Sequence, residues 1–291
     1  MVKKEKFVIN QKLKKELENK TILVTGGAGS IGIALIKFLL KYPVKSIRAL
    51  DIDEHGLFRL GRETKDIRLR LLLGDLQNKE RIMMAGKNVD IVIHTAAIKN
   101  IEISEYNPME TIETNVIGTM NLVKMAMEYK PKKFLNISTD KATEPTTLYG
   151  LTKQMGEKIT SWAGVHLDGT KFSTIRFGNI IETRGNVFEV WEEESKKGLP
   201  LSITNPEMKR YFFHVDETVD FIMKILLIMK KGEIFVPKMK SYKIVDLANK
   251  VSKNHKQIGL RRGEKMEEVL ISDREKEISK ETKDFFIIPP Q

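Results

Sequence analysis

Short apolar runs and helical periodicity alternate along the chain from residue 20 to residue 177. The apolar runs predict strands at 21–25, 46–51, 69–75, 90–97, 132–139 and 171–177. Apolar side chains that recur every three to four residues predict helices over 31–42, 54–62, 107–129 and 147–164. Strands that are apolar throughout and separated by helices are typical of a parallel sheet covered on both faces. The pattern therefore predicts an α/β fold with a doubly wound parallel sheet.

The regular alternation ends near residue 178. Beyond it, the pattern predicts a helix over 214–232 that begins near Asp216, a strand over 232–238, a helix over 242–252 and a charged tail. We divide the chain into an N-terminal basic extension, a sheet domain and a smaller α/β part, at 1–19, 20–177 and 178–291. Within the smaller part, residues 211–238 are expected to return to the sheet. The rest is expected to cover the strand ends, where open α/β sheets bind ligands.

The N-terminal extension has few apolar positions, which are Phe7, Val8, Leu13 and Leu17. Leu13 and Leu17 stand four residues apart and share one face of a helix. We expect a short amphipathic helix packed on the main body. A helix lying on a membrane surface is the alternative.

The composition narrows the classes of protein and ligand. The chain has 50 Lys and Arg against 39 Asp and Glu, a net charge of +11, no Cys and five His. Without Cys there are no disulfides or thiolate sites, and no two His stand at metal-ligand spacing, so no metal site is expected. No run approaches the ~20 apolar residues of a membrane span, and no secretory signal opens the chain, which indicates a cytoplasmic protein. The positive charge favours an anionic ligand, but the low aromatic content and the lack of a compact basic motif argue against nucleic acid.

The segment TGGAGSIG at 25–32 lies between the first strand and the first helix. Gly26 permits a tight turn, Gly29 lets the backbone approach a pyrophosphate, and Gly32 permits close packing of the helix. The helix N-terminus, at Ser30 and Ile31, offers N–H donors and a partial positive charge. This strand, turn and helix predict a Rossmann-type dinucleotide site.

Acidic residues after the next strands indicate which dinucleotide binds. Asp51 ends the second strand, where a carboxylate accepts hydrogen bonds from the ribose and repels a 2′-phosphate, which favours NAD over NADP. Asp53 is an alternative candidate for this role. The positive charge of Arg48 keeps NADP as a possible cofactor. Asp75, after the third strand, is a candidate for the adenine edge or, alternatively, for the N-cap of a helix.

The helix over 147–164 carries the strongest catalytic candidate. Tyr149 and Lys153 are one helical turn apart, so their side chains share a face. A lysine cation beside the phenol would lower the pKa of Tyr149, which could then act as acid or base toward an alcohol or sugar hydroxyl. Thr139 ends the preceding strand and is a candidate to bind the same hydroxyl.

These motifs resemble those of the extended short-chain dehydrogenase/reductase family. The matching segments are TGGAGSIG, HTAA at 94–97, TNVIGT with Asn115, and the set Thr139, Tyr149 and Lys153. Four further segments resemble the nucleotide-sugar 4,6-dehydratases of polysaccharide biosynthesis, which act on UDP-N-acetylglucosamine. They are STDKA at 138–142, FGNIIETRGNV at 177–187, PLSITNPEMKRYF at 200–212 and RRGEKMEEVL at 261–270. Thr95, Thr183, Asn186 and Arg262 depart from that pattern, which leaves the exact substrate open.

The resemblance implies a complete reaction and a set of site residues. It implies the short form of the family, a homo-oligomer that converts the sugar to a 4-keto-6-deoxy product, with C5 inversion in some members, by an internal NAD(P) hydride cycle. Asp140 would protonate the C6 hydroxyl, which needs a raised pKa, and Lys141 would take the C5 proton, which needs a depressed pKa. Further cofactor candidates are Leu76, Ala96, Ala97 and Asn115. Candidates for the UDP-sugar are Lys99, Asn179, Arg184, Thr204, Met208, Arg210, Arg261 and Glu264.

Three other functions remain as alternatives. A nucleotide-sugar 4-epimerase needs Thr139, Tyr149 and Lys153 but no acid and base for C5 and C6. The dTDP-glucose 4,6-dehydratases resemble this chain less, because they carry Asp-Glu where this chain has Asp140 and Lys141. A non-catalytic NAD(P)-binding regulator would not need the intact pair of Tyr149 and Lys153.

Overall fold

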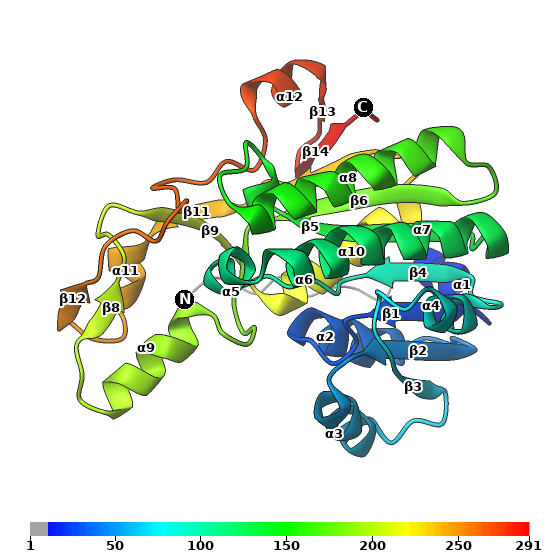
Figure 1. The fold of residues 1–291 in the computed structure, drawn as a ribbon, viewed down its shortest axis with the longest axis horizontal. Coiled ribbons are helices and arrows are strands. Elements are labelled where there is room, and N and C mark those ends of the chain that lie inside the picture. The colour runs from blue at the N-terminus through cyan, green and yellow to red at the C-terminus, as the bar shows by residue number, and fades with distance from the viewer. Residues whose placement is uncertain (1–10, 291) are drawn as a thin grey trace.

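The computed structural model describes residues 11–290, which are built around a large, mostly parallel sheet (Figure 1). Among these residues, nine strands form the sheet in the order β13-β14-β10-β6-β5-β4-β1-β2-β3. The strands predicted from apolar runs lie side by side and parallel, as β1 (Thr21–Thr25), β2 (Ser46–Asp51), β3 (Leu69–Leu73), β4 (Ile91–His94), β5 (Lys133–Thr139) and β6 (Lys171–Phe177). The predicted α/β fold with a doubly wound parallel sheet is confirmed.

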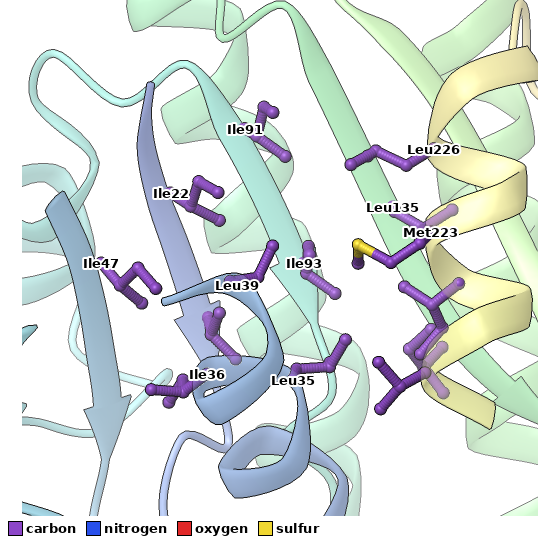
Figure 2. Packing of buried hydrophobic residues seen from close by; sticks show 14 of the residues in the cluster. Ile22, Leu35, Ile36, Leu39, Ile47, Ile91, Ile93, Leu135, Met223 and Leu226 are labelled. Carbon is purple, nitrogen blue, oxygen red and sulfur yellow. The ribbon is translucent and has the colours of Figure 1, made fainter. Parts of the chain in front are cut away.

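One face of the sheet packs against α2 (Ser30–Leu39) and α10 (Val215–Ile228). Figure 2 shows the apolar side chains of these two helices meeting those of the strands. Its labelled residues, all buried, are Ile22, Leu35, Ile36, Leu39, Ile47, Ile91, Ile93, Leu135, Met223 and Leu226. Burial of each such side chain adds about 1.5–3 kcal/mol to the stability of the fold. The side chains of α3 (Glu54–Thr64) join the same cluster.

The opposite face is covered by α4 (Lys79–Gly86), α7 (Gly118–Tyr129) and α8 (Leu148–His166). We did not predict α4, which is short and only weakly amphipathic. The predicted helix over 107–129 is divided into α6 (Pro108–Ile112), a π-helical turn over Glu113–Ile117 and α7, and α5 (Ile101–Tyr106) precedes it. Pro108 has no N–H to continue a helix and stands at the first position of α6, where that loss costs least.

The helix α1 (Gln11–Leu17) packs on the main body next to α10. Leu13 and Leu17 are fully buried, and Glu16 forms an ion pair of 2.7 Å with the buried Lys133 of β5. Phe7 and Val8 lie outside the described residues. Within residues 11–290, no helix has both the length and the apolar character needed to cross a membrane.

Those segments after residue 178 that do not return to the main sheet form the smaller part in the structure, which projects beyond the carboxyl ends of the sheet strands at the left of Figure 1. It contains α9 (Val187–Lys196), α11 (Ile244–Ala248) and two small sheets, and it has its own core around the fully buried Trp191. The small sheets are formed by β7 (Asn179–Ile180), β9 (Lys209–Phe213) and β11 (Lys240–Lys243), and by β8 (Leu201–Ile203) and β12 (His255–Gln257). The predicted helix over 242–252 is therefore wrong in its bounds, because its first residues extend β11.

Several later segments return to the main sheet. The strand β10 (Ile234–Pro237) pairs with β6, and β14 (Phe285–Ile288) and β13 (Lys280–Glu281) continue the sheet in antiparallel fashion after α12 (Asp273–Ile278). The helix α10 begins at Val215, next to Asp216 as predicted, with His214 at its N-cap, and the Glu217 carboxylate accepts a hydrogen bond from His214 N (2.8 Å). The boundaries at 19/20 and 177/178 stay predictions.

Candidate active site

A cleft of about 510 Å³ lies between the carboxyl ends of the sheet strands and the smaller part. The segments after β4 and β5, the start of α8 and residues of the smaller part line it. The site residues predicted from the sequence that line this cleft are Ile31, Ala97, Lys99, Thr139, Lys141, Tyr149, Lys153, Asn179, Arg184, Thr204, Met208, Arg210, Arg261 and Glu264. The structure thus brings together residues that lie more than a hundred positions apart in the chain.

The glycine turn between β1 and α2 leaves no space for side chains. Gly26 has a φ of +69°, and a β-carbon there would lie 2.8 Å from Ala96 N. A β-carbon at Gly32 would overlap the carbonyl oxygen of Gly26, and one at Gly29 would lie 3.2 Å from that oxygen. The turn is therefore a cradle of bare backbone at the N-terminus of α2, which suits the binding of a pyrophosphate.

The Asp51 carboxylate supports this cradle. Its Oδ2 accepts a hydrogen bond from Ala28 N (2.9 Å), and its Oδ1 accepts one from Asp53 N (3.0 Å). Asp53 instead caps α3 by accepting a hydrogen bond from Gly56 N (2.8 Å), and this bond lowers the pKa of Asp53. Asp51 is thus the acid that lies directly beside the turn.

Two cofactor candidates lie after β3 and do not line the cleft. Asp75 accepts a hydrogen bond from Gln77 N (2.9 Å), whereas the N-cap of α4 is Asn78, so the alternative of Asp75 as an N-cap is wrong. Leu76 is buried, and its carbonyl accepts a hydrogen bond from Asn121 Nδ2 (2.9 Å). Contact of either residue with adenine stays a prediction.

Asn115 lies in the π-helical turn and fixes the loop after β4. Its Oδ1 accepts a hydrogen bond from Ile98 N (2.8 Å), and its Nδ2 donates to Ile98 O (2.9 Å) and to Thr152 Oγ1 of α8 (3.0 Å). Asn115 is buried and does not line the cleft. Its structural role is to hold Ala97 and Lys99 near α8, and direct contact with the cofactor stays a prediction.

The start of α8 is pressed against the turn that follows β5. Thr147 caps the helix by accepting a hydrogen bond from Gly150 N (3.1 Å). A β-carbon at Gly150 would overlap the carbonyl oxygen of Lys141, so only glycine allows this approach. The approach places Tyr149 beside Thr139 and Lys141.

The candidate catalytic residues form a connected set. Lys141 Nζ donates to Asp140 Oδ1 (3.0 Å), and Thr139 Oγ1 donates to the same oxygen (3.0 Å). The Thr139 hydroxyl also faces Tyr149, to which it can donate instead of to Asp140, and this contact acts to lower the pKa of Tyr149. Asp140 is fully buried and does not line the cleft, and its Oδ2 makes no hydrogen bond with any residue of 11–290.

The structure corrects the predicted electrostatics of Tyr149. Burial raises its pKa, and the cation that opposes this rise is Lys141, with the Thr139 hydrogen bond acting in the same direction. Burial lowers the pKa of Lys153 to about 8, although Glu157 opposes the shift. The predicted lowering of the Tyr149 pKa by Lys153 is therefore wrong for this structure, because desolvation outweighs the cation and the acting cation is a different lysine.

The predicted depression of the Lys141 pKa is also wrong. Burial lowers this pKa, but the negative charges of Asp140 and Glu268, together with Tyr149, outweigh burial and raise it. Lys141 therefore rests as an ammonium paired with the Asp140 carboxylate.

Sequence reasoning missed two buried groups of this region. His94 at the end of β4 binds Thr25 Oγ1 (2.7 Å) and Thr119 Oγ1 (3.1 Å), and burial and Lys153 lower its pKa to about 3, so it is neutral. Glu268 is 4% exposed and lies close enough to Lys141 to affect its pKa. The only signal for Glu268 was its place in RRGEKMEEVL, where the neighbouring Glu267 looks equivalent.

The cations predicted to bind phosphate differ in their contacts. Arg210 is buried and donates to the carbonyls of Lys209 (2.8 Å) and Lys265 (2.8 Å), with Glu264 at 3.4 Å. Arg261 is 46% exposed and pairs with Glu102 at 2.7 Å. Arg261 is thus more available to a new anion than Arg210, whose guanidinium is committed to the C-terminal segment.

A bridge formed by Arg184 joins the smaller part to the cofactor turn. Arg184 N donates to Ser30 Oγ (3.0 Å), and its guanidinium pairs with Asp53 Oδ2 (3.3 Å). Lys99 Nζ donates to Arg184 O (3.1 Å). Asn186, which departs from the family pattern, caps α9 by accepting from Phe188 N (2.8 Å).

Comparison with known proteins places this chain in a family. A family model described as polysaccharide biosynthesis protein matches residues 22–290. The chain belongs to this family. The resemblance inferred from its motifs is confirmed.

Three relatives from this comparison cover most of the chain. An uncharacterized membrane protein of Methanocaldococcus jannaschii is 41% identical, over 94% of this chain and 86% of that protein. A UDP-N-acetylglucosamine 4,6-dehydratase (inverting) of Campylobacter jejuni is 38% identical, over 93% and 83%. A UDP-glucose 4-epimerase of Rickettsia rickettsii is 34% identical, over 93% and 83%.

Solved structures share the architecture. Pen from Bacillus thuringiensis is 33% identical and superposes with a TM-score of 0.91, over 94% of this chain and 89% of that chain. The dTDP-glucose 4,6-dehydratase DesIV of Streptomyces venezuelae, with NAD and TYD bound, has a TM-score of 0.79 at 21% identity, over 88% and 90%. The second likeness shows the fold alone.

Proposed function

We propose that this protein is an NAD-dependent nucleotide-sugar 4,6-dehydratase whose substrate is UDP-N-acetylglucosamine. The observation that carries the proposal is the pair of Asp140 and Lys141, joined at 3.0 Å and connected to Tyr149 through Thr139. Oxidation at C4 needs only a group such as Tyr149, whereas removal of water across C5 and C6 needs a separate acid and base. The relative of Campylobacter jejuni bears the name of this activity.

The residues of the glycine turn fit NAD. The bare backbone at Gly26, Gly29 and Gly32 leaves room for a pyrophosphate, and the Asp51 carboxylate beside it can accept hydrogen bonds from a ribose. Ile31 and Ala97 line the same cleft as Tyr149. NAD bound there would supply the hydride acceptor for C4 and the hydride donor for C6.

The first proton transfer would take place at the C4 hydroxyl. Tyr149, as the phenolate, accepts this proton, and the Lys141 ammonium and the Thr139 hydroxyl stabilise that phenolate. The 4-keto group makes the C5 hydrogen acidic. No metal ion is needed for this step.

The elimination would use the one proton that Asp140 and Lys141 share. With Lys141 as the amine and Asp140 as the acid, the amine takes the C5 proton. Asp140 does not line the cleft, so its proton passes to Thr139, whose hydroxyl in turn protonates the C6 hydroxyl, which leaves as water. The Lys141 ammonium then returns a proton to C5, and C6 receives hydride. The proton taken from the C4 hydroxyl can pass from Tyr149 through Thr139 to Asp140, which restores the acid.

The nearest alternative is a nucleotide-sugar 4-epimerase, the named activity of the relative of Rickettsia rickettsii. Such an enzyme would use Thr139 and Tyr149 but would leave C5 and C6 unchanged. The Asp140–Lys141 pair would then have no chemical task.

Mass spectrometry separates the two functions. Purified protein is incubated with UDP-N-acetylglucosamine, UDP-glucose or dTDP-glucose and a catalytic amount of NAD. The proposal expects UDP-N-acetylglucosamine to lose the mass of one water over many turnovers, and NMR of the product then reports the configuration at C5. Conversion without a change of mass would favour the epimerase, and stoichiometric consumption of NAD would indicate an ordinary dehydrogenase.

A further inference from the structure

Glu268 is a buried carboxylate near Asp140 and Lys141 of the candidate active site. Its side chain is 4% exposed, and within the described part of the chain its Oε2 makes no hydrogen bond. Lys265 Nζ lies 3.8 Å from that oxygen, too far for a hydrogen bond. A buried carboxylate oxygen without a hydrogen bond is costly, so its retention calls for an explanation.

The segment that carries Glu268 is held against the catalytic turn. Thr146 Oγ1 donates to Gly263 O (2.6 Å), Lys265 Nζ donates to Thr143 O (3.1 Å), and Thr143 Oγ1 donates to Leu270 O (3.4 Å). On the other side, Arg210 of β9 donates to Lys265 O (2.8 Å). These contacts fix the backbone on both sides of Glu268 next to Asp140 and Lys141.

The charged groups around Glu268 come from three elements. Lys141 and Asp140 face it from the turn after β5, Arg210 faces it from β9, and Lys265 lies on its own segment. Burial raises the pKa of Glu268, Lys141 opposes this shift, and Asp140 adds to it. In return, Glu268 raises the pKa of Lys141, which also faces Tyr149 of α8.

The proton between Lys141 and Asp140 can rest on either partner. One arrangement is an ammonium and a carboxylate, and the other is an amine and a carboxylic acid, with the same number of protons. The elimination proposed above starts from the second arrangement. A negative charge on Glu268 favours the ammonium, whereas a neutral Glu268 makes the amine easier to reach.

We propose that Glu268 is a positioning residue whose charge sets whether the shared proton rests on Lys141 or on Asp140. The inference rests on the proposed dehydratase function and adds a residue to it. Glu268 does not line the cleft, so it acts through Lys141 rather than on the sugar. Asp140 Oδ2 and Glu268 Oε2, which have no hydrogen-bond partner among the described residues, then belong to one buried group of side chains that shares a single mobile proton.

The test compares Glu268→Gln with the wild type across pH. Two rates are measured with UDP-N-acetylglucosamine: incorporation of solvent deuterium at C5, and the first hydride transfer, followed by the absorbance of reduced cofactor in single turnovers. Loss of the negative charge lowers the pKa of Lys141, so the acidic limb of the C5 profile should move to lower pH by about one unit. At a pH on that limb, C5 exchange should be about tenfold faster, while the first hydride transfer stays within about twofold.

Two further variants keep the inference falsifiable. Glu267→Gln removes the neighbouring carboxylate, which is 52% exposed and pairs with Lys209, and should leave both rates unchanged. Glu268→Asp withdraws the charge by one methylene and should shift the C5 profile in the same direction by less. If Glu268→Gln does not fold, Glu268→Asp decides the question.

C5 profiles of the Glu268 variants that coincide with that of Glu267→Gln would overturn the role of Glu268. That result would leave the dehydratase function intact, because the wild type would still remove water. A wild type that removes no water and exchanges no C5 hydrogen would instead overturn the proposed function itself.

Discussion

Gly150 in the first turn of α8 lies against the carbonyl oxygen of Lys141 so closely that a β-carbon at 150 would overlap it. This contact sets the distance between the helix that carries Tyr149 and the turn that carries Asp140 and Lys141. The candidate chemistry therefore requires glycine at position 150, because even the methyl group of alanine would not fit there.

Gly150→Ala should push α8 away from the catalytic turn. Overpacking of this kind costs about 1–3 kcal/mol of the free energy of unfolding. Displacement of Tyr149 should also slow C4 oxidation. Urea unfolding and single-turnover hydride transfer measure the two effects.

Gly156→Ala is the matched control in the same helix. The nearest atom to a β-carbon at Gly156 is Asn136 Nδ2, at 3.7 Å, so there is room for it. Removal of a helical glycine should leave activity unchanged and add about 0.5–1 kcal/mol of stability. Equal effects of the two substitutions would show that the Gly150 contact is unimportant.

Lys141→Met should stop the elimination while leaving NAD binding nearly intact. Loss of a general base costs about 10²–10⁴-fold in rate. C5 exchange with deuterated water should fall in parallel, since Lys141 is the proposed acceptor. Mass spectrometry of the product and deuterium incorporation measure both losses.

Tyr149→Phe is the companion variant because it should block the first hydride transfer instead. Reduced cofactor should still accumulate with Lys141→Met, but more slowly than the wild type forms it, because the cation that stabilises the Tyr149 phenolate is lost. It should not accumulate with Tyr149→Phe. Near-normal elimination by Lys141→Met would place the base elsewhere and strengthen the epimerase alternative.

Asp51→Asn should weaken NAD binding more than NADP binding. The amide can still accept the Ala28 N hydrogen bond, but it accepts ribose hydroxyls less strongly and no longer repels a 2′-phosphate. Loss of a charged hydrogen-bond acceptor predicts about a tenfold loss of NAD affinity. Asp53→Asn should leave the preference between the two dinucleotides unchanged, because Asn caps a helix as well as Asp and loss of the ion pair with Arg184 affects both dinucleotides alike. A wild type that prefers NADP in a binding titration would show that Asp51 is misassigned.

Lys153 should make folding stability depend on pH. Its pKa is about 8 in the folded protein, against an ordinary value of 10.5, because burial disfavours the ammonium. The unfolded chain therefore binds the proton more readily between pH 8 and 10.5, and stability should rise with pH across that window. Lys153→Met should stabilise the fold by at most about 3 kcal/mol below pH 8 and by progressively less toward pH 10.5. Urea unfolding at pH 7 and 9.5 checks this, with Lys124→Met, an exposed lysine of α7, as the control that should show no such trend.

The protein is expected to form a homo-oligomer through the apolar side chains that α5 and α6 expose. Ile103, Tyr106 and Met109 are 53%, 87% and 68% exposed. Such a group of large apolar side chains is typical of an interface. Light scattering of the wild type should give a multiple of the chain mass, and the double change Tyr106→Ser and Met109→Ser should reduce it. Ile67→Ser, which alters an isolated exposed residue, should not.

The centre of the sheet could be predicted from the sequence because β1, β4 and β5 are buried on both faces. Runs such as TILVT and KFLNIST do not alternate between apolar and polar residues, which is typical of strands covered by helices on both faces. Together with the glycine turn, they predict the helix–sheet–helix layers and the edge of the sheet at which the cofactor binds. The pair of Tyr149 and Lys153 could also be predicted from a local pattern. Residues four apart on a helix share a face, whatever surrounds the helix.

The electrostatics could not be predicted, because they depend on contacts between distant segments. Glu268 acts on Lys141 from a segment more than a hundred residues away, and Arg210 is held by the carbonyl of Lys265. The small sheets and the return of β14 to the main sheet were missed because their strands are short and carry no clear period. Local patterns predict local structure, whereas these contacts arise only in the folded chain.

The Arg184 bridge ties a loop of the smaller part to both Ser30 and Asp53, at the entrance to the glycine cradle. A dehydrogenase must release its spent dinucleotide in every turnover, so a closed entrance would slow it. An enzyme that leaves its dinucleotide in the original redox state has no such need. For this protein, a loop fastened across the entrance would let one dinucleotide serve many sugar molecules, as a resident prosthetic group rather than a second substrate.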